Sequence, residues 1–272
     1  MRSVRSLLLP CAAIVLVAVM AHAPAAHGKP GAAGRSGAAG VKRPSSDTSR
    51  VHVGPAGAGT EAFIVWPGGS GAAPAVIVAH EEWGLNGQIR EVARRLAAGG
   101  YVAIVPDLYH GTVTAEPAKA RELMRGLADD AALVDLEGAV TWLREQPSTA
   151  KSRIGVIGFG MGGRFAELLD LHSDQLSAAV MFYGPPEADP RKLAGLRAPL
   201  QGHFATEDED IPAARVEALR AALVKAGKPA DVYVYSGAGH AFMNEELPSF
   251  HADAARQAWA RTLGFLQKHL KD

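Results

Sequence analysis

The chain has 272 residues, with 28 basic residues, 28 acidic residues and one cysteine. This length suits one domain with a substantial hydrophobic core, preceded by a short extra segment. Positions 1–50 hold 7 of the basic residues and 1 of the acidic ones, which leaves 21 basic and 27 acidic residues and a net charge of −6 for positions 51–272. Nucleic-acid-binding domains concentrate basic residues on one face, so no nucleic-acid partner is expected.

The first 28 residues have the organisation of a signal peptide. Arg2 and Arg5 precede an apolar stretch from Leu7 to Met20, and small residues of the Ala-x-Ala type follow. The stretch is shorter than the ~20 residues that span a bilayer. We therefore predict cleavage, export to the periplasm or outside the cell, and no stable membrane span afterwards; an uncleaved anchor is the alternative. Cys11 lies inside this segment, so the mature protein has no thiol for a disulfide.

Residues 29–50 are rich in Ala, Gly, Pro and Ser. A segment of this composition buries too little apolar surface to offset its ordering entropy. It predicts a disordered linker, followed by one folded domain over residues 51–272.

The folded domain alternates apolar runs with helical patterns. Two short antiparallel strands are expected first, at Val51–Val53 and Ala62–Trp66. Buried parallel strands are then expected at 75–79, 101–105, 154–157, 178–182, 200–204 and 232–235. Helices are expected at 87–98, 118–145 with a break, 161–171, 212–226 and 249–269. The alternation predicts an α/β fold, with a mostly parallel twisted sheet of about 7–8 strands and helices on both faces.

Five loops follow the predicted parallel strands, at 80–87, 107–111, 158–163, 206–211 and 236–244. In open α/β sheets, ligands bind beyond the carboxyl ends of the strands. We therefore expect these loops to meet at one crevice.

The loop at 158–163 has the pattern of a nucleophile elbow. A buried strand runs into a turn framed by Gly158 and Gly162, and an apolar helix follows. This arrangement presents a Ser or Cys at the top of an α/β-hydrolase sheet. The corresponding residue here is Gly160, which has no side chain.

Four segments, in order and with matching spacing, resemble the dienelactone hydrolase family over residues 60–270. They are residues 76–86 (VIVAHEEWGLN), 158–163 (GFGMGG), 207–212 (EDEDIP) and 239–242 (GHAF). The resemblance implies an α/β-hydrolase fold and hydrolysis of a small-molecule carboxylic ester or lactone.

The same resemblance assigns site residues. The family's nucleophile, acid and histidine fall on Gly160, Asp208 and His240, in the chain order of α/β-hydrolases. Its oxyanion hole falls on the backbone amides of Glu82 and Met161. Alternatives are a loop histidine at 240 and a solvated acidic loop around Asp208.

The expected pocket residues are Glu81, Trp83, Tyr109, Phe242 and Asn244. The family glutamate that matches Glu81 meets the nucleophilic cysteine; the alternative is a surface carboxylate. Asn244 stands where the name-giving enzymes have one of two arginines that bind a substrate carboxylate, and the second falls near Arg121 or Arg125. The sequence thus gives little support to an anionic substrate.

His80, His110 and His203, together with Asp107 and Glu81, are residue types that bind metals. No HExxH or comparable ligand spacing is present in the sequence. We expect no metal and no cofactor. The simplest interpretation of Phe159, Phe165, Tyr183 and Trp66 is that they are core residues.

Glycine at 160 excludes covalent catalysis at the elbow and leaves three interpretations. The first is a recently inactivated enzyme or a one-base error in the sequence, because Cys and Gly codons differ by one base. The second is direct hydrolysis by a water that His240 and Asp208 activate, with or without help from Glu81. The third is an exported protein that binds a small molecule without turnover. The sequence leaves the oligomeric state open.

Overall fold

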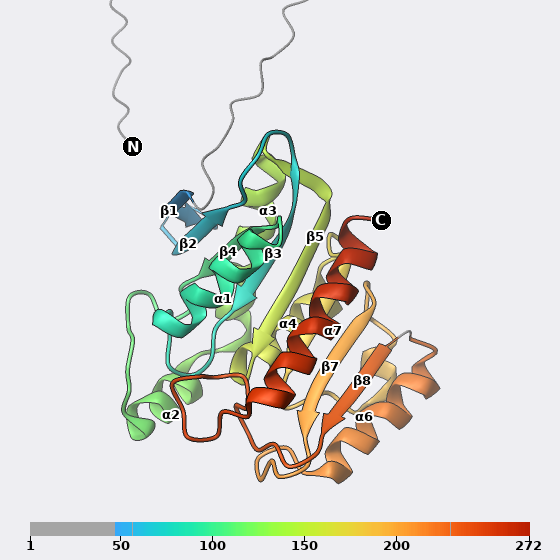
Figure 1. Ribbon diagram of the computed structural model, residues 1–272. Coiled ribbons are helices and arrows are strands. Elements are labelled where there is room, and N and C mark those ends of the chain that lie inside the picture. The colour runs from blue at the N-terminus through green and yellow to red at the C-terminus, as the bar shows by residue number, and fades with distance from the viewer. Residues whose placement is uncertain (1–46, 56, 229) are drawn as a thin grey trace, which may run out of the picture. The chain divides into compact units, whose positions relative to one another are not determined.

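The computed structural model describes residues 47–55, 57–228 and 230–272 (Figure 1). The predicted signal peptide and residues 29–46 of the predicted linker lie outside the described residues. Within the described part of the chain, no helix has the length and apolar character needed to cross a membrane.

Eight strands form one sheet in the order β1-β2-β4-β3-β5-β6-β7-β8 (Figure 1). Their bounds are β1 Asp47–Val53, β2 Thr60–Trp66, β3 Ala73–Ala79, β4 Val102–Pro106, β5 Thr149–Phe159, β6 Ala178–Phe182, β7 Leu200–Ala205 and β8 Ala230–Tyr235. β1 pairs antiparallel with β2 and β2 with β4, and the other neighbours are parallel. The predicted α/β fold is confirmed.

The helices cover both faces of this sheet. They are α1 Gly87–Ala98, α2 Pro117–Gly126, α3 Asp129–Glu145, α4 Met161–His172, α5 Pro190–Leu193, α6 Ala213–Ala226 and α7 Ala252–Leu270. One hydrophobic core joins α3, α4 and α6 to the sheet, and a second joins α1 and α7 to it. Successive strand residues enter opposite cores, as Ile64 and Val65 do, because side chains alternate across a strand.

The chain order reverses around β3. β4 lies on one side of β3 and β5 lies on the other. Such a switch point opens a crevice at the carboxyl ends of the two strands. The loops after β3 and β5 contain Glu82 and Gly160, so the topology brings these two residues to the crevice.

Three details differ from the expectations. β1 begins at Asp47, so residues 47–50 belong to the folded domain and not to the linker. Their polar character suits an edge strand, and for the same reason it resembles a linker in the sequence. β5 begins at Thr149, five residues early. The helix α5 was not predicted, because four residues are too few to show a helical period.

Candidate active site

The turn between β5 and α4 has the backbone of a nucleophile elbow. Gly160 has φ 53° and ψ −117°, a conformation that disfavours residues with a Cβ atom. Its N–H donates to the carbonyl oxygen of Phe182 at 3.0 Å, and its own carbonyl accepts from the N–H of Gly163 at 3.0 Å. The strand and the helix therefore meet at a tight, hydrogen-bonded turn even though the nucleophile is absent.

The glycines that frame the turn are required by close backbone contacts. A Cβ at Gly158 would overlap the carbonyl oxygen of Gly162, and a Cβ at Gly162 would overlap the carbonyl oxygen of Ala79. Gly160 differs from both. A Cβ there would lie 3.2 Å from Oε2 of Glu82 and 4.0 Å from Cγ of Glu81, so it would meet no backbone and would require only a small shift of the flexible Glu82 side chain.

His240 and Asp208 form a hydrogen-bonded pair. His240 Nδ1 lies 2.9 Å from Oδ2 of Asp208, whose side chain is fully buried. Oδ1 of Asp208 accepts hydrogen bonds from the backbone N–H groups of Asp210 and Ile211, both at 2.9 Å. Because the carboxylate accepts the Nδ1 proton, Nε2 is the acceptor nitrogen of a neutral His240. No described residue bonds to that Nε2.

The contact between His240 and Asp208 raises the pKa of the histidine and lowers that of the aspartate, so it favours the charged form of each. For His240, burial opposes protonation, but the hydrogen bond to Asp208 and the charges of Asp208, Asp210 and Glu82 outweigh it, so the pKa is raised above 6.5. For Asp208, burial likewise opposes ionisation, and the contacts with His240 and the two N–H groups lower its pKa below 3.8. The geometry favours a carboxylate that stabilises an imidazolium.

The backbone amides of Met161 and Glu82, two residues that line the cavity described below, are available as donors. Met161 is the first residue of α4, so its N–H has no partner within the helix and lies at the positive end of the helix dipole. Glu82 follows β3 at the switch point. No described group accepts a hydrogen bond from either amide.

A cavity of about 520 Å³ opens over the elbow. Its lining comprises Glu82, Arg121, Met124, Leu127, Asp129, Gly160, Met161, Arg164, Phe165, Tyr183, Pro185, Asp210, Ile211, Arg215 and His240. The predicted loops at 80–87, 158–163, 206–211 and 236–244 therefore meet as expected. The loop at 107–111 does not line this cavity.

Comparison with known proteins agrees with this geometry. The model of the "Dienelactone hydrolase family" matches residues 60–270. A Yersinia pestis protein named "Putative carboxymethylenebutenolidase" is 36% identical over 214 residues, which cover 74% of this chain and 80% of that protein. A protein of the same name from Escherichia coli K12 is 35% identical over 213 residues, 73% of this chain and 78% of that one.

The chain belongs to the dienelactone hydrolase family. A crystal structure of a "Putative Dienelactone Hydrolase" from Klebsiella pneumoniae has a TM-score of 0.74 at 30% identity, covering 82% of this chain and 99% of that one. A Pyrococcus horikoshii acylaminoacyl peptidase has a TM-score of 0.65 at 15% identity, covering 85% of this chain and 43% of that one, and shows the α/β-hydrolase fold alone.

Glu81 is a buried residue near Gly160, and its carboxyl group accepts two hydrogen bonds. Its Oε1 accepts from the Tyr183 hydroxyl at 2.9 Å, and its Oε2 accepts from Nδ2 of Asn244 at 2.6 Å. Burial, followed by the charge of Glu82, raises the pKa of Glu81 to about 7, although the two hydrogen bonds lower it. Glu81 is a buried carboxyl and not a surface one.

None of the five expected pocket residues is in the cavity lining, neither Glu81 and Asn244 nor Trp83, Tyr109 and Phe242. Phe242 is fully buried and its ring packs against that of Tyr183, with centroids 5.3 Å apart. The buried Tyr109 hydroxyl donates a hydrogen bond to Sδ of Met161 at 3.2 Å. The indole Nε1 of Trp83 is buried with no partner among the described residues. Sequence position alone suggested the pocket for these three side chains, whereas none of them lines the cavity.

Tyr183 and Phe165 were interpreted as core residues, and both also line the cavity. Tyr183 binds Glu81, and its ring packs edge-on against that of His240, with centroids 5.3 Å apart. Its position directly after a predicted strand was the available signal. The family's second substrate-binding arginine falls near Arg121 or Arg125 in the sequence. Arg121 lines the cavity, and Arg125 does not.

The histidines considered for a metal site have structural partners. His80 contacts the backbone of Glu81 and Leu108, and His203 contacts Tyr235, Gln201 and Thr262. Within the described chain, one His and carboxylate group has its ligand atoms within 4.8 Å of one another, Asp208, Asp210 and His240. This group is the hydrogen-bonded pair itself with a neighbouring carboxylate.

Proposed function

We propose that this family member slowly hydrolyses small carboxylic esters or lactones by direct attack of water, with His240 as general base. The observation that carries the proposal is the His240–Asp208 pair, which opens onto the same cavity as Gly160 and the Met161 amide. The name carboxymethylenebutenolidase, borne by relatives of the chain, points to a lactone as one substrate class.

The reaction follows from the positions of these groups. Nε2 of His240 takes a proton from water, and the resulting hydroxide attacks the carbonyl carbon. The amides of Glu82 and Met161 stabilise the oxyanion. When the tetrahedral intermediate collapses, the alkoxide leaves and takes the proton from the imidazolium, which Asp208 has stabilised meanwhile.

The space beside Gly160 suits the attacking water. A nucleophile side chain would project toward Glu82 Oε2 and Glu81, and both are polar groups. A water there can donate its second hydrogen to the Glu82 carboxylate while His240 accepts the first. The same carboxylate repels an anionic group at that point, which favours a neutral ester at the reacting centre.

Slow turnover is expected because the covalent step is lost. Removal of a triad nucleophile typically leaves roughly 10³ to 10⁴-fold acceleration over water, supplied by the oxyanion hole and binding. A general base contributes roughly 10² to 10⁴-fold. The hydrolytic rate of the protein should therefore exceed the spontaneous rate measurably only with a reactive ester.

The test is hydrolysis of 4-nitrophenyl acetate by the parent, Gly160→Cys and His240→Ala. The parent should turn over without a burst, and His240→Ala should lose at least about tenfold. Gly160→Cys should gain orders of magnitude and show an acyl-enzyme burst, despite a backbone strain of about 1–2 kcal/mol at positive φ. Equal rates of hydrolysis in the parent and His240→Ala would contradict the water mechanism.

A second candidate function is binding without turnover, favoured by a cavity that persists where the nucleophile does not. It predicts ligand-dependent thermal stabilisation by esters that the parent never hydrolyses. In either case we propose export, which rests on the N-terminal sequence pattern alone.

A further inference from the structure

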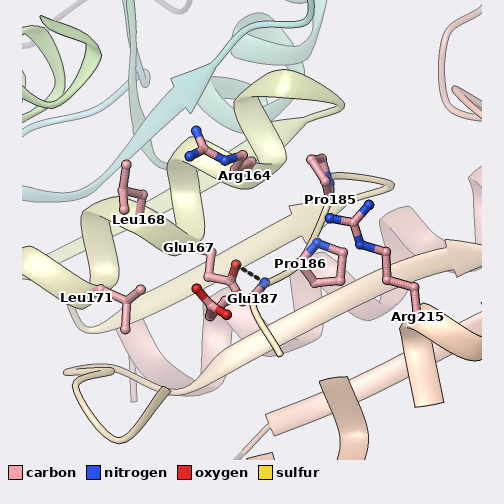
Figure 2. A pocket seen from close by; sticks show the side chains of 8 residues that line it. All are labelled: Arg164, Glu167, Leu168, Leu171, Pro185, Pro186, Glu187 and Arg215. Atoms are coloured by element: carbon pink, nitrogen blue, oxygen red, sulfur yellow. Dashed lines mark hydrogen bonds between the residues drawn. The ribbon is translucent and has the colours of Figure 1, made fainter. Parts of the chain in front are cut away.

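A second cavity, of about 230 Å³, lies between α4 and the loop that follows β6 (Figure 2). One stripe of α4, the loop and α6 provide its lining, which is Arg164, Glu167, Leu168, Leu171, Pro185, Pro186, Glu187 and Arg215. The volume is below the ~300–1,000 Å³ of pockets for drug-sized ligands. Its occupant must therefore be small.

Glu167 is the unusual member of this lining. The residue is only 3% exposed, and its Oε2 accepts from the backbone N–H of Glu187 at 2.9 Å. Its Oε1 is buried without a hydrogen-bond partner among the described residues. Leaving such an atom unpaired costs ~1–3 kcal/mol, so a group that completes the bond is expected to stabilise the site.

The protonation state of Glu167 defines the missing partner. Burial, supported by the nearby charges of Glu187 and Asp170, raises its pKa to about 8, although the N–H of Glu187 and the charge of Arg164 lower it. At neutral pH the carboxyl therefore carries a proton. Because Oε2 already accepts a hydrogen bond, the proton belongs on Oε1, which then needs an acceptor.

The charges around the cavity favour an anion. Arg164 makes two hydrogen bonds to Asp129, and Lys192 binds Glu187 at 2.9 Å. No described residue forms a hydrogen bond or ion pair with the guanidinium of Arg215. The uncompensated charge is therefore positive, while Leu168, Leu171 and the two prolines offer apolar surface.

We propose that this cavity binds a small aliphatic carboxylate. Its oxygens accept hydrogen bonds from the Arg215 guanidinium and from the Glu167 hydroxyl, and its hydrocarbon chain packs against the leucines and prolines. The site is separate from the elbow, and its occupancy does not depend on turnover. Arg164, Pro185 and Arg215 line both cavities, so an acid released at the elbow has the chemistry that this second cavity selects.

Calorimetric titration of the full chain with sodium butyrate at pH 7 tests the proposal. Butyrate should bind one saturable site, and n-butylammonium chloride at equal ionic strength should not bind. Arg215→Met should weaken the binding of butyrate at least about tenfold, because it removes a charge-assisted hydrogen bond. Leu171→Trp, which fills this cavity, should abolish binding. Met124→Trp, which fills only the elbow cavity, should leave it unchanged.

A pH series separates Glu167 from Arg215, which borders both cavities. The charged groups near Glu167 are Arg164 and Asp170 on its own helix, Glu187 on the loop and Arg215 on α6. Above pH 8 an ionised Glu167 repels butyrate, so affinity should fall about fivefold or more by pH 9.5. Glu167→Gln keeps a donor and should bind with no such fall.

Three results would overturn the proposal: no saturable binding of butyrate, binding that Met124→Trp abolishes while Arg215→Met does not weaken it, or an unchanged pH dependence in Glu167→Gln. If Leu171→Trp does not fold, the Met124→Trp and Glu167→Gln comparisons still decide the outcome. None of these readouts involves ester turnover, so failure here is distinguishable from failure of the hydrolytic proposal.

Discussion

At the scale of single residues, Gly160 changes the chemistry of the site while the backbone keeps the shape of an elbow. Its φ of 53° costs a glycine little, whereas a cysteine or serine in the same turn carries strain. The residues that would serve a nucleophile remain paired, as His240 does with Asp208.

The protonation of His240 should control the proposed activity. Only the neutral imidazole accepts a proton from water, so kcat/KM should rise with pH through a midpoint above 6.5, because Asp208 raises the pKa of His240. Asp208→Asn removes that interaction and should lower both the rate and the midpoint. The check is a pH–rate profile of the parent and this variant with 4-nitrophenyl acetate. An identical midpoint in the two proteins would contradict the pairing.

The protonation of Glu81 should control stability. Its pKa is about 7 in the folded protein against 4.5 ordinarily, so between these values the native state holds a proton that the unfolded state releases. The free energy of unfolding should fall by on the order of 2–3 kcal/mol from pH 4.5 to 7 through this group.

Glu81→Gln should remove this fall, at the cost of about 1 kcal/mol for the bond that Asn244 loses. Urea unfolding at several pH values measures the effect, with the exposed Glu91→Gln as the matched control. Glu167, whose pKa is also raised, leaves part of the slope in both proteins. A slope in Glu81→Gln as steep as in the parent would contradict the assignment to Glu81.

At the scale of elements, the junction of β5 and α4 depends on close backbone approach. Gly162→Ala places a Cβ against the backbone of Ala79 and should destabilise the fold by about 3 kcal/mol or more. Gly264→Ala is the matched control. Gly264 is exposed within α7 and a Cβ there meets nothing within 4 Å, so the change should stabilise by about 0.5–1 kcal/mol. Chemical denaturation of both variants decides; similar effects would mean that the junction is not tightly packed.

At the scale of the whole molecule, β1 is the first described element and forms one edge of the sheet. Each of its seven residues pairs with β2, and Val53 is 1% exposed. A chain of residues 47–272 should therefore melt within about 2 °C of residues 29–272, whereas residues 54–272 should melt at least about 5 °C lower. Thermal unfolding followed by circular dichroism gives the comparison. Equal melting temperatures for 47–272 and 54–272 would show that β1 contributes no stability.

Most elements of the fold were predictable because their signals are local. Parallel strands buried on both faces are short apolar runs, and the helices between them have a 3.6-residue period. The exceptions lack those signals. Residues 47–50 are polar because they lie on an edge strand, and α5 is a single turn. The positions of Asp208 and His240 came from the resemblance to the family, and the structure brings the two side chains together at the carboxyl ends of strands, where the fold places ligands.

The sequence by itself determined the fold class, the elbow and its missing side chain, and the order of Gly160, Asp208 and His240. Only the tertiary structure showed that Glu81 binds Tyr183 and Asn244, which are 102 and 163 residues away. It also showed that none of the five expected pocket residues lines the cavity, and that Glu167 Oε1 is unpaired at a second cavity that Arg215 also lines. The physical reason is that burial, hydrogen-bond partners and pKa depend on residues that packing brings together from distant elements. The signals for strands, helices and turns come from residues that are neighbours in the sequence.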